Sequence, residues 1–485
     1  MRVPAKAFAL AALAATLAPP MSGAAVADAP QTSLRPQARP VVIAGSVTAA
    51  SLAQVIDRAT PAAAPAAAPA SQPQTTPRAS VILASASSLR PRLRPSALAS
   101  SGSRSATPQA TPVAADPGFT AWLSGFRRRA MAEGITGATF DRAFRNARFM
   151  PEVIAKDRNQ SEFTKSIGDY MDGAVSDSRV RNGRREYSRN TRLLSSIESS
   201  YGVPGQYITA IWGLETAYGS YRGKTPLISS MATLAYEGRR GAFYEAQLIA
   251  LLKVVQHGDS QPENMLGSWA GASGHTQFMP TSYLGYAVDH TGDGRRDIWS
   301  DDPSDSLASS ANYLAKHGWR RGQPWGVEVT LPANFDYTQA NGPERMPSAW
   351  ARLGVRPARG QLRDYGNARL LLLAGARGPA FLVFHNFDVI KRYNNADTYA
   401  LAVGILGDRI AGAGDITRPW PQGERMLKRS ERVELQRLLT RRGYDTGGVD
   451  GILGSRSTAA IRAYQRSIGA TPDGHPSVAL LSRLR

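Results

Sequence analysis

One carboxylate stands in a strongly apolar segment of this sequence, the stretch AIWGLETAYG at residues 210–219. If the segment is helical, Ile208, Ile211 and Trp212 lie on the same face as Glu215. The other sides are also apolar, and a helix that is apolar nearly all round is normally buried. Because no Lys or Arg lies within one helical turn, the sequence predicts a buried acid without a local cationic partner.

A buried carboxyl group keeps its proton to a higher pH than usual, because burial disfavours the charged form. Gly219 is expected to end the helix, so Glu215 would lie in the last turn, where the negative end of the helix dipole acts in the same direction. An acid that is protonated near neutral pH is what cleavage of a glycosidic bond requires. The alternative is structural, a buried ion pair with an arginine distant in sequence such as Arg239 or Arg240.

Composition excludes several other chemistries. The 485-residue chain contains no cysteine, which excludes disulfides, thiolate nucleophiles and Cys-ligated zinc. Its six histidines form no HExxH pair, and the chain has neither a GxSxG elbow nor a glycine-rich phosphate loop after a strand. The net charge of +20 suggests an anionic partner. Nucleic acid is not expected, because no motif interleaves basic with aromatic residues.

The first 27 residues have the pattern of an export signal: Arg2 and Lys6, a short apolar run over 7–18, and Ala-Val-Ala at 25–27. This run is too short to span a bilayer, and no later stretch is apolar enough to do so. The sequence therefore predicts an exported, soluble periplasmic protein with no integral membrane segment after signal removal. Residues 28–115 are rich in Ala, Pro and Ser and are predicted to form a disordered tether.

The region 117–418 is expected to be one mainly helical α+β domain. Helical spacing of apolar residues runs through 119–135, 192–203, 228–259 and 306–319. Short β-like runs follow at 326–331, 369–375 and 380–384. These runs are too few and too late in the chain for a repeating βαβ unit.

A linker-like segment, RPWPQGER at 418–425, leads to a region of different texture at 424–485. Leu435, Leu438 and Leu439 are spaced as one helix, and Ile461 and Tyr464 as a second helix, with Ser457 or Thr458 expected as its N-cap. Glycine-rich turns separate these two helices from each other and from a last helix. The pattern indicates a small three-helix domain.

The motifs GLETAYGSYRG, GSWAGASGHTQFMPTSYLGYAVD, TGDGRRDIW and FDVIKRYNNADTYALAV together resemble the lytic transglycosylase B family. The members of this family are bacterial enzymes with a lysozyme-like fold that cleave the glycan strands of peptidoglycan. The region 424–485 resembles the type 1 peptidoglycan-binding domain. The resemblance implies a lysozyme-like catalytic domain, a wall-binding domain, glycan strands as the partner, and no required cofactor.

The resemblance also implies roles for single residues, with Glu215 matching the family's catalytic acid. The positions that match the sugar cleft and the polar–aromatic cluster beside the acid are Ser268, Gln277, Phe278, Arg239, Arg240, Tyr313, Tyr393, Asn394 and Tyr399. Aromatic faces stack on sugar rings, while amides and hydroxyls bond their substituents. For any single tyrosine, ordinary core packing is the alternative. His275 stands where relatives have other residues and is assigned no role.

The stretch DHTGDGRRD at 289–297 resembles a calcium-binding loop. Its ligand positions are occupied by Asp289, Thr291, Asp293, Asp297 and the carbonyl group of Arg295. Position 12 is Ser300 instead of the usual glutamate. In some relatives a downstream aspartate closes a longer loop, and here that residue would be Asp305. The sequence leaves two alternatives, a structural calcium site and a metal-free loop capped by its own acids.

Together these features predict an exported lytic transglycosylase that cleaves the MurNAc–GlcNAc β-1,4 bond and leaves 1,6-anhydro-MurNAc ends. Glu215 would act first as acid and then as base. Other glycosidases need two carboxylates at the bond, and the motif regions offer one. Two alternatives remain: a hydrolytic muramidase of the same fold and a non-catalytic wall-binding scaffold. The intact Glu215 within intact motifs argues against the scaffold.

Overall fold

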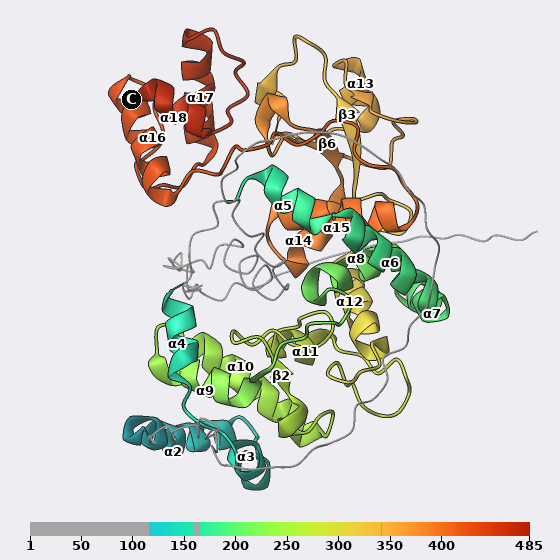
Figure 1. Cartoon of the computed structure of the whole chain (residues 1–485), viewed down its shortest axis with the longest axis vertical. Coiled ribbons are helices and arrows are strands. Elements are labelled where there is room, and N and C mark those ends of the chain that lie inside the picture. The colour runs from blue at the N-terminus through green and yellow to red at the C-terminus, as the bar shows by residue number, and fades with distance from the viewer. Residues whose placement is uncertain (1–115, 160–164, 341) are drawn as a thin grey trace, which may run out of the picture. The chain divides into compact units, whose positions relative to one another are not determined.

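The computed structural model describes residues 116–159, 165–340 and 342–485. The predicted export signal at 1–27 and the predicted tether at 28–115 lie outside these residues. Most of the described chain is helical, and it includes a four-stranded antiparallel sheet (Figure 1). The predicted mainly helical α+β class is therefore confirmed.

A first group of helices encloses a core with many aromatic side chains, among them Phe126, Tyr244 and Tyr283. Helix α9 is central, and α2, α4 and α10 pack against it. The continuous helical pattern over 228–259 is in fact two helices, because Gly238 adopts a left-handed φ of 87° between them. The helices of this group are α2 (Pro117–Ala132), α3 (Gly137–Phe144), α4 (Pro151–Arg158), α9 (Leu227–Glu237), α10 (Gly241–His257) and α11 (Pro280–Tyr286).

A second group of helices surrounds α8, the helix that carries Glu215. Helices α6, α7, α12 and α15 all pack against α8. The core between them contains Ile208, Ile211 and Trp212 of α8, as the apolar spacing predicts. The helices of this group are α5 (Ile167–Ala174), α6 (Asp177–Arg189), α7 (Thr191–Tyr201), α8 (Gly205–Thr216), α12 (Ser304–Lys316), α14 (His385–Tyr393) and α15 (Asp397–Ile410).

The four-stranded sheet has the order β4–β3–β6–β5 and is antiparallel throughout. The predicted β-like runs form β3 (Gly326–Thr330), β5 (Arg369–Leu371) and β6 (Ala380–Val383), whereas β4 (Arg356–Pro357) is too short for a sequence signal. Helix α13 (Pro347–Arg352) packs Trp350 into the hydrophobic core that the sheet residues form. A separate two-stranded pair, β1 (Thr225–Pro226) and β2 (Leu266–Gly267), joins the segment after α8 to the segment before the GASGHTQF motif. Short 3₁₀ turns lie at Pro262–Asn264, Tyr337–Gln339 and Gly375–Arg377.

The C-terminal region forms the predicted three-helix domain, with α16 (Arg429–Arg441), α17 (Ser455–Ser467) and α18 (Val478–Leu484) around their own apolar core. The expected N-cap of α17 is wrong, because this helix begins at Ser455 after Gly454. The Ser457 hydroxyl instead donates to the Thr446 carbonyl oxygen at 2.9 Å and accepts from Gln436 at 3.2 Å. It therefore ties the loop before α17 to α16.

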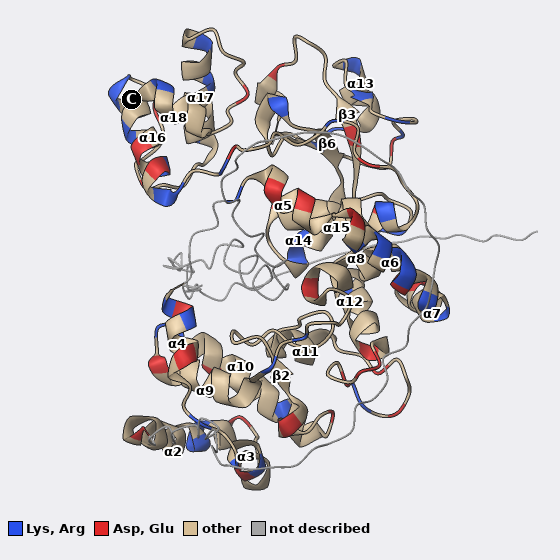
Figure 2. Cartoon of the chain, in the orientation of Figure 1, with Lys and Arg blue, Asp and Glu red and all other residues tan. Residues whose placement is uncertain are grey.

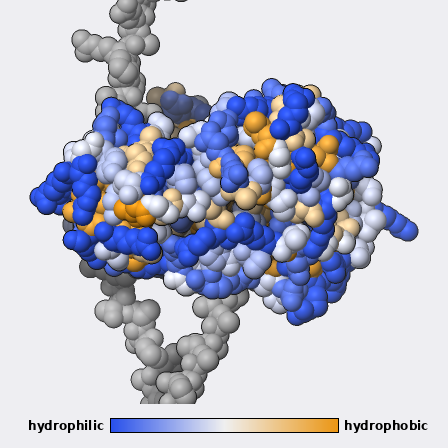
Figure 3. All heavy atoms as spheres, turned by 90° about the horizontal axis from the view of Figure 1, so that it is seen from above, coloured by the Kyte–Doolittle hydropathy of each residue, from blue (hydrophilic) through white to orange (hydrophobic). Residues whose placement is uncertain are grey.

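The described residues include no helix that is both long and apolar enough to cross a membrane. The face drawn in Figure 3 is mostly hydrophilic, with apolar side chains in small separate areas. Positive charge is spread over many elements. Basic residues lie along α6, while α16 carries both basic and acidic residues (Figure 2). On the described part of the chain, the net positive charge is therefore distributed over several surfaces.

Candidate active site

Glu215 occupies the last turn of α8 and is 3% exposed. The α8 residues from 207 to 216 are all buried, which agrees with their apolar character on every side. The sequence positions this acid because a helix without a polar face must be enclosed by other elements. The helices that pack on α8 thus remove the carboxyl group from bulk water.

The carboxyl group of Glu215 accepts one hydrogen bond from the described residues, from the Tyr399 hydroxyl to Oε1 at 2.6 Å. No ion pair to Glu215 occurs in the described part of the chain. Arg239 and Arg240 both pair with Asp157 of α4, so the structural alternative of an ion pair with either arginine is wrong. Burial raises the pKa of Glu215 to about 8, against the opposing effect of the Tyr399 hydrogen bond. At neutral pH the group is therefore an uncharged acid.

The backbone after Glu215 turns sharply, because Ala217, Tyr218 and Gly219 have φ values of 49°, 62° and 81°. Helix α8 consequently ends at Thr216, three residues before Gly219, and the predicted helix end is wrong. Side-chain contacts stabilise this early end. The Thr216 hydroxyl accepts the N–H of Gly219 at 3.0 Å, and the Tyr218 hydroxyl donates to the Arg179 carbonyl oxygen at 2.7 Å.

The predicted aromatic residues lie together beside the acid. The ring of Phe278 lies 5.9 Å from the rings of both Tyr313 and Tyr393, and these two tyrosines are 5.2 Å apart. The Tyr393 hydroxyl donates to the Thr276 carbonyl oxygen at 2.6 Å. Burial raises the pKa values of Tyr393 and Tyr399, and the negative charge available to Glu215 adds to this effect. These phenols therefore act as neutral hydrogen-bonding groups.

Ser268 and Gln277 belong to one loop, in which Ser273 pairs with both Gly267 and Phe278. The Ser268 hydroxyl accepts the Ala272 N–H at 3.0 Å. Gln277 has a left-handed φ of 57°, and its amide donates to the Arg222 and Gly274 carbonyl oxygens at 3.3 and 3.0 Å. These hydrogen bonds fix the backbone of the loop and thereby the positions of both predicted polar residues.

Asn394 is 2% exposed, and neither polar atom of its side-chain amide has a partner within the described ranges. A buried amide without partners is costly to the fold. It follows directly after Tyr393 of the aromatic cluster. The amide is thus held beside the aromatic cluster without a hydrogen bond from the described residues that offsets its burial.

Arg239 and Arg240 follow α9, and their guanidinium groups are engaged by the Asp157 carboxylate, which is almost fully buried. Arg240 also bonds the Tyr244 hydroxyl and lies over its ring, 4.8 Å from the centroid. The structure thus joins these two arginines to α4 and α10, and not to the group around Glu215. Their predicted contact with sugar stays a prediction.

The loop at 289–297 brings three carboxylates together, with oxygen atoms of Asp289, Asp293 and Asp305 within 4.8 Å of one another. Asp305, at the start of α12, also accepts the N–H groups of His290 and Thr291 at 2.8 and 3.1 Å. The donor set is made of oxygen atoms, which is the type that calcium prefers. Asp305, which the resemblance placed at the end of the loop, therefore converges in space with Asp289 and Asp293, whereas Asp297 is not part of this group of carboxylates.

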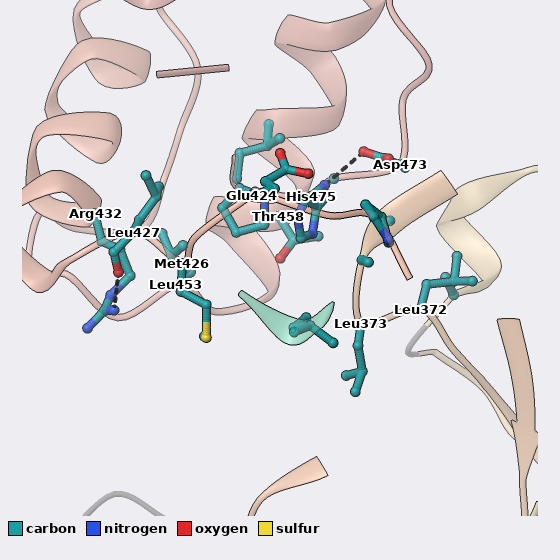
Figure 4. Close-up of a pocket in the computed structure, with 18 of the residues that line it drawn as sticks. Leu372, Leu373, Glu424, Met426, Leu427, Arg432, Leu453, Thr458, Asp473 and His475 are labelled. Atoms are coloured by element: carbon teal, nitrogen blue, oxygen red, sulfur yellow. Dashed lines mark hydrogen bonds between the residues drawn. The ribbon is translucent and has the colours of Figure 1, made fainter. Parts of the chain in front are cut away.

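A pocket of about 370 Å³ lies apart from this site and is lined by apolar residues such as Leu372, Leu373, Leu427 and Leu453, together with His475 (Figure 4). None of the predicted site residues lines it. The chemistry implied by Glu215 therefore does not depend on this pocket.

Comparison with known proteins identifies the family. Residues 118–408 match the transglycosylase SLT domain, and residues 428–484 match the putative peptidoglycan binding domain. The chain belongs to the transglycosylase SLT domain family. This membership confirms the predicted family, the lytic transglycosylase activity and the small peptidoglycan-binding domain.

Several relatives of this transglycosylase are known. The chain is 35% identical over 249 residues to membrane-bound lytic murein transglycosylase B of Escherichia coli (strain K12), which is 50% of this chain and 66% of that protein. SltB3 from Pseudomonas aeruginosa, solved in complex with NAG-anhNAM-pentapeptide, is 49% identical, with 76% of this chain and 100% of that chain covered and a TM-score of 0.72. Escherichia coli Slt35 in complex with calcium is 30% identical, with 61% and 93% covered and a TM-score of 0.52.

The structure also brings residues to this transglycosylase site that the sequence reasoning missed. Ser310 of α12 lies 3.1 Å from the Tyr393 hydroxyl, and His275 lies against the end of α8. Nothing in their spacing relates them to Glu215, because the contacts join elements far apart in the chain. The position of His275 inside the GASGHTQF motif was the available signal, and the resemblance gave it no role.

Proposed function

We propose that Glu215 is the single acid–base group of this lytic transglycosylase. The supporting observation is its buried, uncharged carboxyl group, which one tyrosine hydroxyl contacts and no described cation neutralises. Because the Tyr399 donor occupies Oε1, the proton of the acid belongs on Oε2. An uncharged acid fixed in this way can protonate the oxygen of a leaving sugar at neutral pH.

The proposed reaction uses the same carboxyl group twice. Glu215 gives its proton to the glycosidic oxygen, and the bond from that oxygen to C1 of MurNAc breaks. The resulting carboxylate then removes the proton from the C6 hydroxyl of the same sugar, and O6 forms a bond to C1. The product is a 1,6-anhydro ring, water is not consumed, and the acid is regenerated. The intramolecular hydroxyl has the advantage over water of a high effective concentration.

The residues around the acid have suitable types for holding the glycan strand. Tyr313 and Tyr393 are half-buried and offer apolar ring faces to sugars, while the buried ring of Phe278 packs against both of them. Ser268 and Gln277 add polar groups from the adjacent loop. The SltB3 complex with NAG-anhNAM-pentapeptide supports a peptidoglycan fragment as the ligand of this fold.

Replacement of Glu215 by glutamine tests the catalytic role. The amide retains the shape of the side chain but can neither donate the proton nor take it back. We expect turnover of purified peptidoglycan to fall by about 10⁴-fold or more. A folded Glu215→Gln variant with near-normal turnover would remove the acid from the mechanism.

We also propose that the loop around Asp289, Asp293 and Asp305 binds a structural calcium ion. The convergence of three carboxylates supports this, and so does the Slt35 structure with calcium. The Thr291 hydroxyl and the Arg295 carbonyl would complete an oxygen shell, and the ion would join the loop to α12. The bound ion would supply charge neutralisation for the carboxylates.

The export signal at 1–27 and a periplasmic location are likewise proposals. An enzyme that acts on peptidoglycan must reach the cell wall, which agrees with the signal pattern at the start of the sequence. Amino-terminal sequencing of the protein recovered from the periplasm should begin near Asp28. A protein recovered only from the cytoplasm with Met1 or Arg2 first would contradict export.

A further inference from the structure

His275 is a buried residue, 4% exposed, whose ring touches the end of the helix that carries Glu215. The indole Nε1 of Trp212 donates to His275 Nδ1 at 3.2 Å, and the two rings meet edge-on with centroids 5.7 Å apart. On the other side of the ring, Nε2 lies 2.9 Å from the Ser300 carbonyl oxygen. An indole only donates and a carbonyl only accepts, so both contacts require one tautomer, with the proton on Nε2.

The backbone of His275 is tied to the same helix end. The Thr216 hydroxyl donates to the His275 carbonyl oxygen at 2.6 Å. Trp212 precedes Glu215 by three residues and Thr216 directly follows it, so His275 contacts both residues that bracket the acid. A Cβ atom on Gly219 would lie only 2.6 Å from His275 Nδ1, so the chain fits closely around the ring.

The loop that contains His275 also contacts the aromatic cluster. Its next residue, Thr276, accepts the hydrogen bond from Tyr393, and its hydroxyl lies 3.0 Å from the Ser306 hydroxyl of α12. The loop therefore has the acid on one side and the cluster on the other. A shift of His275 would change the distance between the two.

The charged neighbours of the ring are Arg222, Asp301 and Asp302. Arg222 Nη1 lies 3.4 Å from Nε2, but its shorter contacts, at 2.9 and 2.6 Å, are to the Trp299 and Ser300 carbonyl oxygens. Burial lowers the pKa of His275 to about 4, with a smaller contribution from Arg222 in the same direction. The ring is therefore neutral over the range in which Glu215 loses its proton.

We propose that His275 is a positioning residue for catalysis: through Trp212 and Thr216 it fixes the Glu215 carboxyl group relative to the aromatic cluster. The inference rests on the proposed role of Glu215 as the acid. His275 itself exchanges no proton with the substrate, and its effect is on geometry and on exclusion of water from the helix end. A carboxyl group displaced by about 1 Å is enough to lower turnover by about a hundredfold.

The test compares variants that keep or remove the bond to Trp212. His275→Leu removes both ring bonds, and we expect kcat to fall about ten- to a hundredfold with little change in KM. His275→Asn places a polar atom near the position of Nδ1 and should recover most of kcat. His275→Gln reaches the Ser300 side and should recover little. Trp212→Phe should add little further loss to His275→Leu, because the shared bond is already absent.

The alkaline limb of the pH profile provides a readout that general destabilisation would not move. Water reaching the helix end in His275→Leu would lower the pKa of Glu215 and shift the alkaline limb of kcat/KM to lower pH. His257→Leu, at an exposed histidine on α10, is the matched control and should leave both the limb and kcat unchanged.

If His275→Leu does not fold, the comparison of His275→Asn with His275→Gln tests the proposal. Equal kcat values for these two variants would overturn it. Wild-type kcat and an unshifted alkaline limb in a folded His275→Leu would also overturn it. Glu215→Gln is measured in parallel. If Glu215→Gln retains activity, the catalytic role of the acid is refuted. If Glu215→Gln is inactive but the His275 variants have wild-type activity, only the positioning role is refuted.

Discussion

The buried, uncharged carboxyl group of Glu215 should reduce the stability of the fold near neutral pH. In the folded chain Glu215 has a pKa of about 8, whereas an unfolded chain has the ordinary value of 4.5. Between these values the folded state holds a proton that the unfolded state has lost. The free energy of unfolding therefore decreases as the pH rises from about 4.5 to about 8, by about 1.4 kcal/mol per pH unit.

At pH 7 this effect amounts to a cost on the order of 3 kcal/mol. Glutamine carries no charge in either state and can keep the hydrogen bond from Tyr399, although its amide N–H groups need acceptors. We therefore expect Glu215→Gln to be more stable than the wild type by about 1–3 kcal/mol at pH 7. The two proteins should be equally stable near pH 4.

The measurement is chemical unfolding of both proteins, followed by circular dichroism at several pH values between about 4 and about 8. The predicted result is a stability difference that grows with pH over this interval and then levels off. A difference that is independent of pH, or a variant that becomes less stable relative to the wild type as the pH rises, would refute a buried, protonated Glu215.

Three further outcomes are expected. Tyr399→Phe removes the hydrogen bond that lowers the pKa of Glu215, so the alkaline limb of kcat/KM should move to higher pH; a limb that stays in place would contradict the contact. Chelation should lower the melting temperature, and calcium should restore it better than magnesium, whereas a melting curve insensitive to both would exclude the metal site. A chain truncated after Arg418 should still cleave soluble muropeptides but sediment poorly with insoluble wall, and loss of soluble activity would contradict a purely targeting role for the C-terminal domain.

The parts of the fold that follow from local pattern were predictable. The apolar sides of α8 predicted its burial, and the β-rich runs predicted β3, β5 and β6, because burial and strand formation leave a periodic signal in the sequence. The acid itself was recognisable because a lone glutamate in a helix without a polar face must be buried, although the residues of the helix alone left an ion pair with a distant arginine as the alternative.

The features that the sequence did not predict, such as the end of α8 and the role of Ser457, depend on contacts between segments distant in the chain. The end of α8 is set by Thr216 and Tyr218, which bond to the His275 and Arg179 carbonyl groups far away in the chain, and not by the nearby Gly219. Ser457 looked like a cap but lies inside α17, where it ties the preceding loop to α16. Such choices depend on the tertiary fold, so a single sequence carries no local trace of them.

Analysis of the reaction products tests the central claim most directly. Purified peptidoglycan is digested with the wild-type enzyme, and the new glycan ends are identified by mass spectrometry. With Glu215 as the only acid–base group and the C6 hydroxyl as nucleophile, the products should end in 1,6-anhydro-MurNAc, lighter by one water than hydrolytic products, and no new reducing ends should form. Products that end only in reducing MurNAc would show attack by water and contradict the single-acid mechanism.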